Sequence, residues 1–192
     1  MENLICNKKA FKILEKLGDR TYKVEFKGKN YFFKQLNSRE EFDDFIYAKK
    51  HLASSGIPVA KIIQKDKKNF SIVTEFIEGE TILDKLIQGP LDETIFPLVF
   101  KLSFFTKIEK FNIDFSPQHF KLCNGKLYYL ETIMMPYEES NNYTNKYIYL
   151  WFYTNKFAEL LKELGYEPDN NRIKPSYESN KEIVLMTCKY YR

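Results

Sequence analysis

The stretch 111–132 constrains this chain more than any other, because it joins a hairpin signal to acidic residues on both sides. An Asn-Gly pair separates two short apolar runs, and both residue types tolerate the positive φ angles of a two-residue hairpin turn. Asp114 precedes the hairpin and Glu131 follows it. A hairpin of this length folds back on itself, so we expect the two acids to approach one mouth, with His119 between them.

Two carboxylates with an imidazole between them could hold a divalent cation and a phosphate. The same residues also have a structural interpretation: Asp114 as a turn residue ahead of Pro117, and Glu131 as a solvated strand end. The choice between these interpretations depends on the rest of the chain.

Composition limits the classes of protein to which the chain can belong. Its 192 residues, 44% hydrophobic and 29% charged, are typical of a globular protein with one large domain or two small lobes. The net charge is +4 and the basic residues are scattered, so we expect no nucleic-acid partner. The three cysteines show no zinc or redox spacing. No apolar run approaches about 18 residues and the N-terminus lacks a signal-peptide core, so a cytoplasmic protein is expected.

The first part of the chain predicts an α+β arrangement of five strands and one helix. Strands are expected at 11–17, 22–26, 31–36, 60–64 and 71–76, where apolar residues alternate or cluster between turn residues. Ser38 and Glu41 have the spacing of a capping box, which predicts a helix after the third strand. Gly56 and Pro58 are expected to end it.

Helices predominate in the second half of the chain. We expect a short helix at 81–87 and a long apolar helix at 96–111, which leads into the hairpin stretch. An amphipathic helix is expected at 145–164, with its aromatic residues in the core. Residues 183–186 fit a strand or a helical turn equally well.

Residues 114–120 resemble the catalytic loop of the protein-kinase-like superfamily. That family has an Asp, a Pro three residues later, a metal-binding Asn five residues later, and a hairpin that ends in a metal-binding Asp. Asp114, Pro117 and the hairpin fit this pattern, whereas His119 stands at the Asn position and Glu131 at that of the second Asp. The Asp-x-x-x-x-His-Phe pattern is similar to bacterial lipopolysaccharide core heptose kinases, in which a His also takes that position.

A lysine and a helix in the first part of the chain carry the resemblance further. Lys34, within the aromatic third strand, resembles the kinase lysine that contacts the nucleotide α- and β-phosphates. The stretch 56–61 resembles the small-lobe segment of aminoglycoside-phosphotransferase-like kinases, whose helix supplies an acid that pairs with this lysine. Asp44 and Glu41 are the candidates, with Asp44 slightly favoured by its distance from the end of the helix.

The segment 74–82 resembles the kinase hinge, in which backbone groups bind adenine. In this chain the groups of Glu75 and Ile77 would do so. Gly18 and Thr21 stand in a sparse equivalent of the glycine-rich loop that covers the phosphates.

The resemblance implies a two-lobed protein-kinase-like fold of the α+β class. A five-stranded antiparallel N-lobe would span 1–78, and a reduced, mostly helical C-lobe would span 79–192. ATP and Mg²⁺ would be the cofactors, with Glu131 as the principal metal ligand and His119 as an auxiliary one. Asp114 would orient or deprotonate the acceptor hydroxyl.

The function that the resemblance implies is ATP-dependent phosphorylation of a hydroxyl on a small molecule or glycan. A glycolipid acceptor would bring the protein close to a membrane surface. The alternative is a pseudokinase, which is a nucleotide- or partner-binding module with little or no catalysis. A third interpretation is an unrelated α+β binding protein. The acceptor and the oligomeric state stay open.

Overall fold

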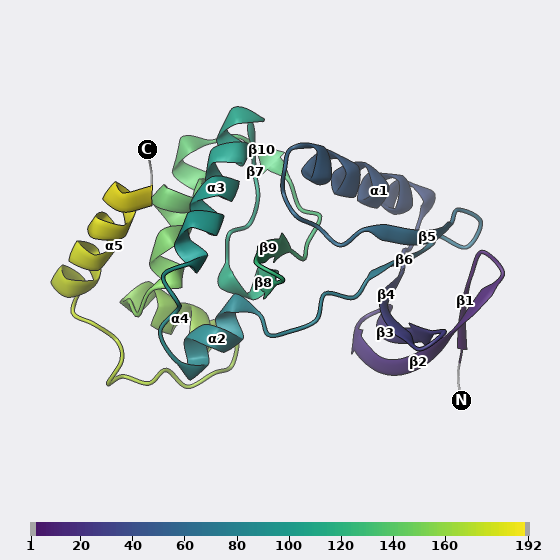
Figure 1. Ribbon diagram of the computed structural model, residues 1–192, viewed down its shortest axis with the longest axis horizontal. Coiled ribbons are helices and arrows are strands. Elements are labelled where there is room, and N and C mark those ends of the chain that lie inside the picture. The colour runs from purple at the N-terminus through teal and green to yellow at the C-terminus, as the bar shows by residue number, and fades with distance from the viewer. Residues whose placement is uncertain (1–2, 191–192) are drawn as a thin grey trace. The chain divides into compact units, whose positions relative to one another are not determined.

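The computed structural model describes residues 3–190. The chain divides between Glu78 and Gly79 into two compact units, which we call unit 1 and unit 2, and the short segment Ser55–Ile57 belongs to unit 2 (Figure 1). None of the helices within the described residues is long and apolar enough to cross a bilayer.

The described residues of unit 1 form an antiparallel sheet of six strands and one helix. The strands are β1 (Asn3–Cys6), β2 (Lys9–Gly18), β3 (Thr21–Phe26), β4 (Lys29–Gln35), β5 (Ile62–Asp66) and β6 (Ser71–Glu75), in the spatial order β1-β2-β3-β4-β6-β5. The prediction of five strands was wrong because it omitted β1. The turn after β1 uses Asn7 and Lys8 at φ +45° and +66°, so it has no glycine to signal it.

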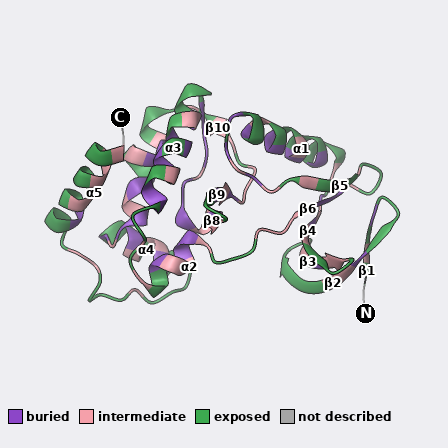
Figure 2. Ribbon diagram, viewed as in Figure 1, coloured by how far each residue is buried: buried purple, intermediate pink, exposed green. Residues whose placement is uncertain are grey.

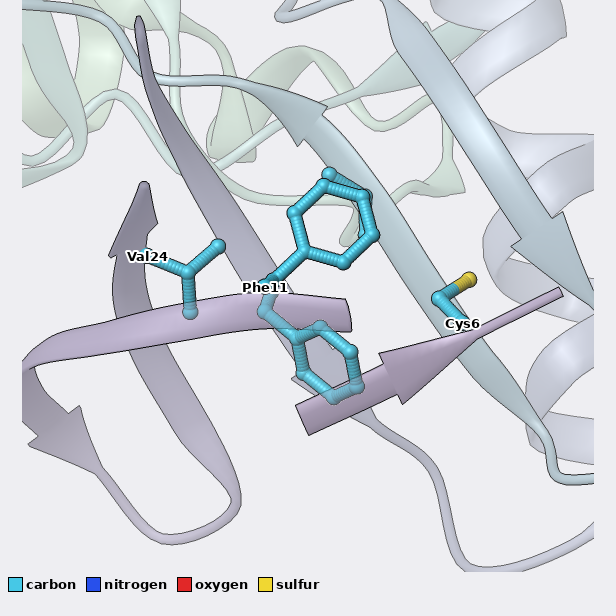
Figure 3. Close-up of a cluster of buried hydrophobic side chains, with 5 residues drawn as sticks. Cys6, Phe11 and Val24 are labelled. Atoms are coloured by element: carbon cyan, nitrogen blue, oxygen red, sulfur yellow. The ribbon is translucent and has the colours of Figure 1, made fainter. Parts of the chain in front are cut away.

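The sheet curls until β1 contacts β5 and β6 at the other end of the strand order. The thiol of Cys6 donates to the backbone oxygen of Ser71 at 3.6 Å, and the Asn7 N–H donates to the Asp66 carboxylate at 2.9 Å. One face of the curled sheet carries a hydrophobic cluster that is almost fully buried (Figure 3). Its members are Cys6, Phe11, Val24, Phe33 and Val73. The curl therefore encloses a core made by the sheet itself.

The helix α1 (Arg39–Ser54) covers the other face of the sheet. Its buried residues Phe42 and Phe45 pack with Ile72, which neighbours Val73 and points to the opposite face. In Figure 2 one side of α1 is buried and the other is exposed. Unit 1 thus has two cores, one on each face of the sheet.

The predicted capping interaction at the start of α1 is present in altered form. The Glu41 N–H donates to the Ser38 hydroxyl at 3.2 Å, as the sequence spacing predicts. The Glu41 carboxylate accepts from the Asn37 N–H at 2.8 Å. The return bond of a capping box would come from Ser38. The Glu41 carboxylate therefore binds the backbone of Asn37, one residue before the capping residue Ser38.

Up to residue 190, unit 2 contains four α-helices and two short β pairs. The helices are α2 (Ile82–Gln88), α3 (Ile95–Ile108), α4 (Asn155–Glu163) and α5 (Ser176–Tyr190). The strands β7 (Phe111–Asn112) and β10 (Met135–Pro136) pair with each other, and β8 (Phe120–Cys123) pairs with β9 (Lys126–Tyr129). The ambiguous segment 183–186 lies within α5, and α3 ends before the predicted residue 111.

The predicted single helix at 145–164 is broken in the structure. A π-helical turn, η3 (Tyr143–Tyr147), leads into a 3₁₀ turn, η4 (Ile148–Trp151), and α4 begins only after the extended residue Phe152. Thr154 explains the new start, because its hydroxyl oxygen accepts from the Phe157 N–H at 3.1 Å. The aromatic side chains Tyr147, Trp151 and Phe157 are buried, which confirms their predicted place in the core.

Candidate functional site

The first part of the candidate site is the loop between β7 and β8 in unit 2. Asp114 lies in this loop, and its carboxylate accepts from the Ser116 N–H at 2.9 Å. The 3₁₀ turn η1 (Pro117–His119) follows, and Pro117 suits its first position because no N–H is needed there. The His119 N–H donates to the Ser116 oxygen at 3.0 Å. Local hydrogen bonds therefore fix the spacing of Asp114 and His119.

The hairpin then brings Glu131 back to this loop. Asn124 and Gly125 have φ of +49° and +70°, which confirms the predicted two-residue turn. Pairing continues past the end of β9, since the Leu130 N–H donates to the His119 oxygen at 2.9 Å. Glu131, the next residue, consequently lies beside His119.

Asp114, His119 and Glu131 form one group of side chains, which we call the acid–histidine cluster. The Nε2 of His119 is 3.6 Å from an oxygen of Asp114, and the Nδ1 is 3.7 Å from an oxygen of Glu131. The side chains are 23%, 30% and 41% exposed for His119, Asp114 and Glu131, so the cluster is reachable from solvent. The expectation that both acids approach one mouth, with His119 between them, is confirmed.

Asp114 is ionised at neutral pH. Burial raises its pKa, but the neighbouring His119 imidazole, 3.6 Å away, and hydrogen bonds from Ser116 outweigh burial and hold the pKa at about 2. A carboxylate with so low a pKa binds a proton weakly at pH 7. It is suited to accept a hydrogen bond from a hydroxyl or to face a cation.

Buried aromatic rings, which we call the aromatic bed, pack against the loop that carries Asp114. The indole N–H of Trp151 donates to the backbone oxygen of Phe115 at 2.7 Å. The rings of Phe115 and Phe120 stack at 5.8 Å between centroids. Burial, followed by the charge of Asp114, raises the pKa of Tyr147 to about 12. The Asp114 loop therefore packs on buried aromatic rings, and the nearby Tyr147 phenol stays protonated.

A second phenol also lies close to Asp114. The Tyr129 hydroxyl donates to the backbone oxygen of Ile133 at 3.2 Å. Burial first, and the charges of Asp114 and Glu131 to a smaller extent, raise the pKa of Tyr129. The phenol stays protonated and holds the chain that follows Glu131.

In unit 1, Lys34 lies on β4 on the face that α1 covers. Its Nζ is 5.5 Å from the centre of the Phe45 ring, and within the described residues it forms no ion pair. The pKa of Glu41 is lowered, chiefly by hydrogen bonds from Asn37 and to a smaller extent by Lys34. Asp44 is exposed. Glu41 is therefore within electrostatic reach of Lys34.

Gly18 and Thr21 face each other across the β2–β3 turn. A Cβ on Gly18 would lie 2.9 Å from the Thr21 hydroxyl, so close packing accounts for the glycine.

Glu75 ends β6, and its carboxylate accepts from the Lys61 N–H at 3.1 Å. Ile77 follows shortly after. The Glu75 side chain therefore has a structural partner within unit 1.

Sequence reasoning did not predict the hydrogen bonds that Ser116 and Trp151 make with the Asp114 loop. A Ser two residues after an Asp is a recognised turn signal, which could have identified Ser116. Trp151 lies far along the chain from the backbone oxygen that it binds, and no local pattern connects the two.

Between residues 3 and 190 no group of three or more His, Cys, Asp or Glu side chains is arranged to hold a metal ion. A scan against models of known protein families finds no match for this chain, and a search of the curated proteins finds none either.

Proposed function

We propose that this chain is an ATP-dependent phosphotransferase that phosphorylates a hydroxyl of a small molecule or glycan. The acid–histidine cluster is the observation that carries this function, because it presents an ionised Asp114 and a second carboxylate at a partly open surface. Phosphoryl transfer needs positioning and charge neutralisation more than covalent chemistry, so few groups suffice.

Unit 1 would serve as the N-lobe of a kinase-like arrangement and unit 2 as a reduced C-lobe. The order of elements supports this assignment. The only helix of unit 1 within the described residues, α1, lies between β4 and β5, and Lys34 is on β4 immediately before it. The strand β1 is an addition to the five strands that the resemblance implies.

Each residue of the candidate site has a separate role in this mechanism. Asp114 accepts a hydrogen bond from the acceptor hydroxyl and orients it, since its low pKa makes it a weak base. Lys34 neutralises the α- and β-phosphates of ATP. The backbone oxygen of Glu75 and the backbone of Ile77 bind adenine, since the Glu75 N–H already donates to the Lys61 oxygen at 2.9 Å. Gly18 and Thr21 cover the phosphates.

Glu131 fits the proposed Mg²⁺ ion better than His119 does. Mg²⁺ in nucleotide sites is held by one or two carboxylates together with phosphate oxygens, whereas imidazole suits softer cations. Glu131 is partly exposed and offers a carboxylate oxygen 3.7 Å from the imidazole. When bound, the ion would neutralise charge on the phosphates.

Thermal unfolding with ATP tests this function directly. ATP with Mg²⁺ or Mn²⁺ is expected to raise the unfolding temperature more than ATP alone, because a ligand of the folded state stabilises it. Lys34→Ala should remove the ATP-dependent shift, and Lys29→Ala, a change of an exposed lysine at the other end of β4, should leave it in place. No ATP-dependent shift in the unaltered chain would overturn the assignment.

Asp114→Asn separates catalysis from binding. The Asn oxygen can still accept from the Ser116 N–H, so the loop should keep its shape. The variant is expected to keep the ATP-dependent thermal shift and to lose phosphate transfer, measured as ATP consumption with mixtures of sugars and small alcohols. Retention of full transfer would exclude Asp114 from the mechanism.

The second candidate function is a pseudokinase, and the geometry of His119 favours it. Both imidazole nitrogens face carboxylates, at the position where the resemblance expects an oxygen ligand for the metal. A thermal shift with ATP that is independent of metal, together with no transfer, would favour this alternative.

A further inference from the structure

A groove in unit 1 has no role in the phosphotransfer mechanism. It lies between α1 and β5, which run close together in Figure 1, and has a volume of about 390 Å³. One wall is formed by Ile46, Lys49, Lys50 and Ala53, which share one face of α1 because of their helical spacing. The other wall is the segment 59–65, which leads into and along β5. The volume is within the range of known ligand pockets.

The floor of the groove is apolar and fixed in place. Val59 is buried, and Ile46 and Ile62 pack against the hydrophobic cluster beneath α1. Ala53 is exposed and small, so it leaves the groove open at that point. A ligand with apolar groups could therefore bury them here without displacing the core.

The sides of the groove are basic. Among residues 3–190, its lining has no acidic side chain. Lys50, Lys61 and Lys65 are exposed, and in the part of the chain that the structure describes their ammonium groups form no ion pair. The carboxylate of Glu75 is nearby, where it accepts from the backbone N–H of Lys61. The field over the apolar floor is consequently positive and favours an anionic ligand.

The shape and the residue types of the groove favour a peptide over other anions. A single-stranded nucleic acid is usually held by aromatic side chains on which bases stack, and none of the described residues that line the groove is aromatic. A bilayer surface is bound by a projecting apolar face, whereas this floor is recessed.

The strand β5 offers a peptide further contacts. It is the last strand in the order of the sheet, so an extended segment could pair with the part of its edge that β1 does not contact. Asn7 in the β1–β2 turn donates to Asp66 and Lys9 at the start of β2 donates to Gln64, so pairing would take place toward Ile62.

We propose that this groove, which we call the lysine groove, binds an acidic peptide segment that carries apolar side chains. The apolar side chains occupy the floor and the carboxylates face Lys50, Lys61 and Lys65. This binding is independent of the phosphotransfer that we assign to the chain, because none of the proposed catalytic or metal-binding residues lines the groove.

Fluorescence anisotropy with the full chain and a labelled peptide in which Leu and Phe alternate with Glu tests the lysine groove. Binding is expected, and it should weaken as salt rises, because exposed charges are screened. The same peptide with Gln in place of Glu should bind at least about tenfold more weakly. Equal binding of the two peptides would overturn the proposed role of the lysines.

Matched charge reversals locate the binding site. Lys61→Glu with Lys65→Glu should weaken peptide binding by about tenfold or more. Lys16→Glu with Lys29→Glu makes the same change of net charge at exposed lysines of β2 and β4, outside the groove, and should alter binding less than about twofold. Equal weakening in both double variants would show that the peptide responds only to net charge and would overturn the site.

Ala53→Trp tests the floor without altering any charge. The large side chain should fill the groove and abolish peptide binding, while the thermal shift with ATP stays as in the unaltered chain. Circular dichroism checks that both groove variants are folded. Stronger binding to phosphatidylserine vesicles or to an oligo-dT strand than to the peptide would overturn the choice of ligand.

Discussion

The two units bury their hydrophobic side chains in different ways. In unit 1 the strands alternate, so neighbours such as Ile72 and Val73 enter separate clusters on opposite faces of one sheet. In unit 2 the core beneath Asp114 is made of aromatic rings from the loop, the hairpin and the irregular turns η3 and η4. Regular alternation makes a core that is visible in the sequence, whereas the aromatic bed depends on contacts between distant segments.

Charged side chains also have different surroundings in the two units. The Asp114 carboxylate is partly buried against rings and held by hydrogen bonds. The lysines of the groove in unit 1 are exposed and rest on an apolar floor. We therefore expect substitutions near Asp114 to change stability and substitutions of the groove lysines to change binding alone.

The largest effect is expected for Phe120→Ala in the aromatic bed. Phe120 is fully buried and its ring contacts those of Phe115, Tyr129 and Trp151. Its truncation should lower the free energy of unfolding by about 3–5 kcal/mol through lost burial and a cavity. Urea unfolding followed by Trp151 fluorescence measures this loss, because Trp151 is the only tryptophan of the chain.

Phe104→Ala is the matched control for this substitution. Phe104 is 50% exposed on α3, so its truncation should cost less than about 1 kcal/mol. Equal losses for the two variants would contradict the packing role of the aromatic bed.

A smaller effect is expected from the titration of Asp114. Its pKa falls from the ordinary 3.8 to about 2 in the folded chain, so its contribution to stability is complete above pH about 4 and is lost as the pH falls toward 2. The contribution should amount to about 2 kcal/mol. Asp114→Asn should remove this part of the acid dependence, as measured by urea unfolding at a series of pH values.

Asp66→Asn gives the corresponding measurement in unit 1. Hydrogen bonds lower the pKa of Asp66, the largest contribution coming from the Asn7 N–H, but this carboxylate lies in an open turn. We expect its removal to change the acid dependence less than Asp114→Asn does. A larger change of the acid dependence for Asp66→Asn than for Asp114→Asn would contradict this comparison of the two carboxylates.

Helix caps should contribute similarly in both units. Thr81 starts α2 with a complete capping box, in which the Asp84 N–H donates to the Thr81 hydroxyl and the Thr81 N–H donates to Asp84. Thr81→Ala and Ser38→Ala should each lower the free energy of unfolding by about 1 kcal/mol. Hydrogen exchange of the first turns of α2 and α1 locates the loss, and an effect that spreads evenly over both units would argue against local caps.

The smallest effects are expected for exposed ion pairs. Lys174 and Glu182 are 2.6 Å apart in unit 2, and Lys67 and Asp43 are 3.5 Å apart in unit 1. Glu182→Gln and Asp43→Asn should each change the free energy of unfolding by less than about 1 kcal/mol, and high salt should abolish the difference from the unaltered chain. A loss that persists in high salt would indicate packing rather than charge.

Much of unit 1 could be predicted from the sequence because its signals are local. Alternation identified five strands, and the Ser38–Glu41 spacing identified the start of α1. β1 was missed because a strand of four residues is too short for alternation to be recognised, and its turn lacks glycine.

The acid–histidine cluster could be predicted because one hairpin joins its members. The Asn124–Gly125 turn sets the register that returns Glu131 to His119. Its surroundings could not be predicted, because Tyr147 and Trp151 reach the loop from a segment whose aromatic residues suggested one continuous helix. The chain breaks before Thr154, whose side chain caps α4, and the periodicity of the aromatic residues does not reveal this break.

The curl of the sheet in unit 1 also has a consequence for self-association. An open sheet presents unpaired backbone groups at both borders, and such borders template aggregation. Because β1 folds round to contact β5 and β6, each border partly shields the other. Removal of this first strand should therefore make the chain prone to form intermolecular β-structure, which light scattering would detect before any loss of helix content.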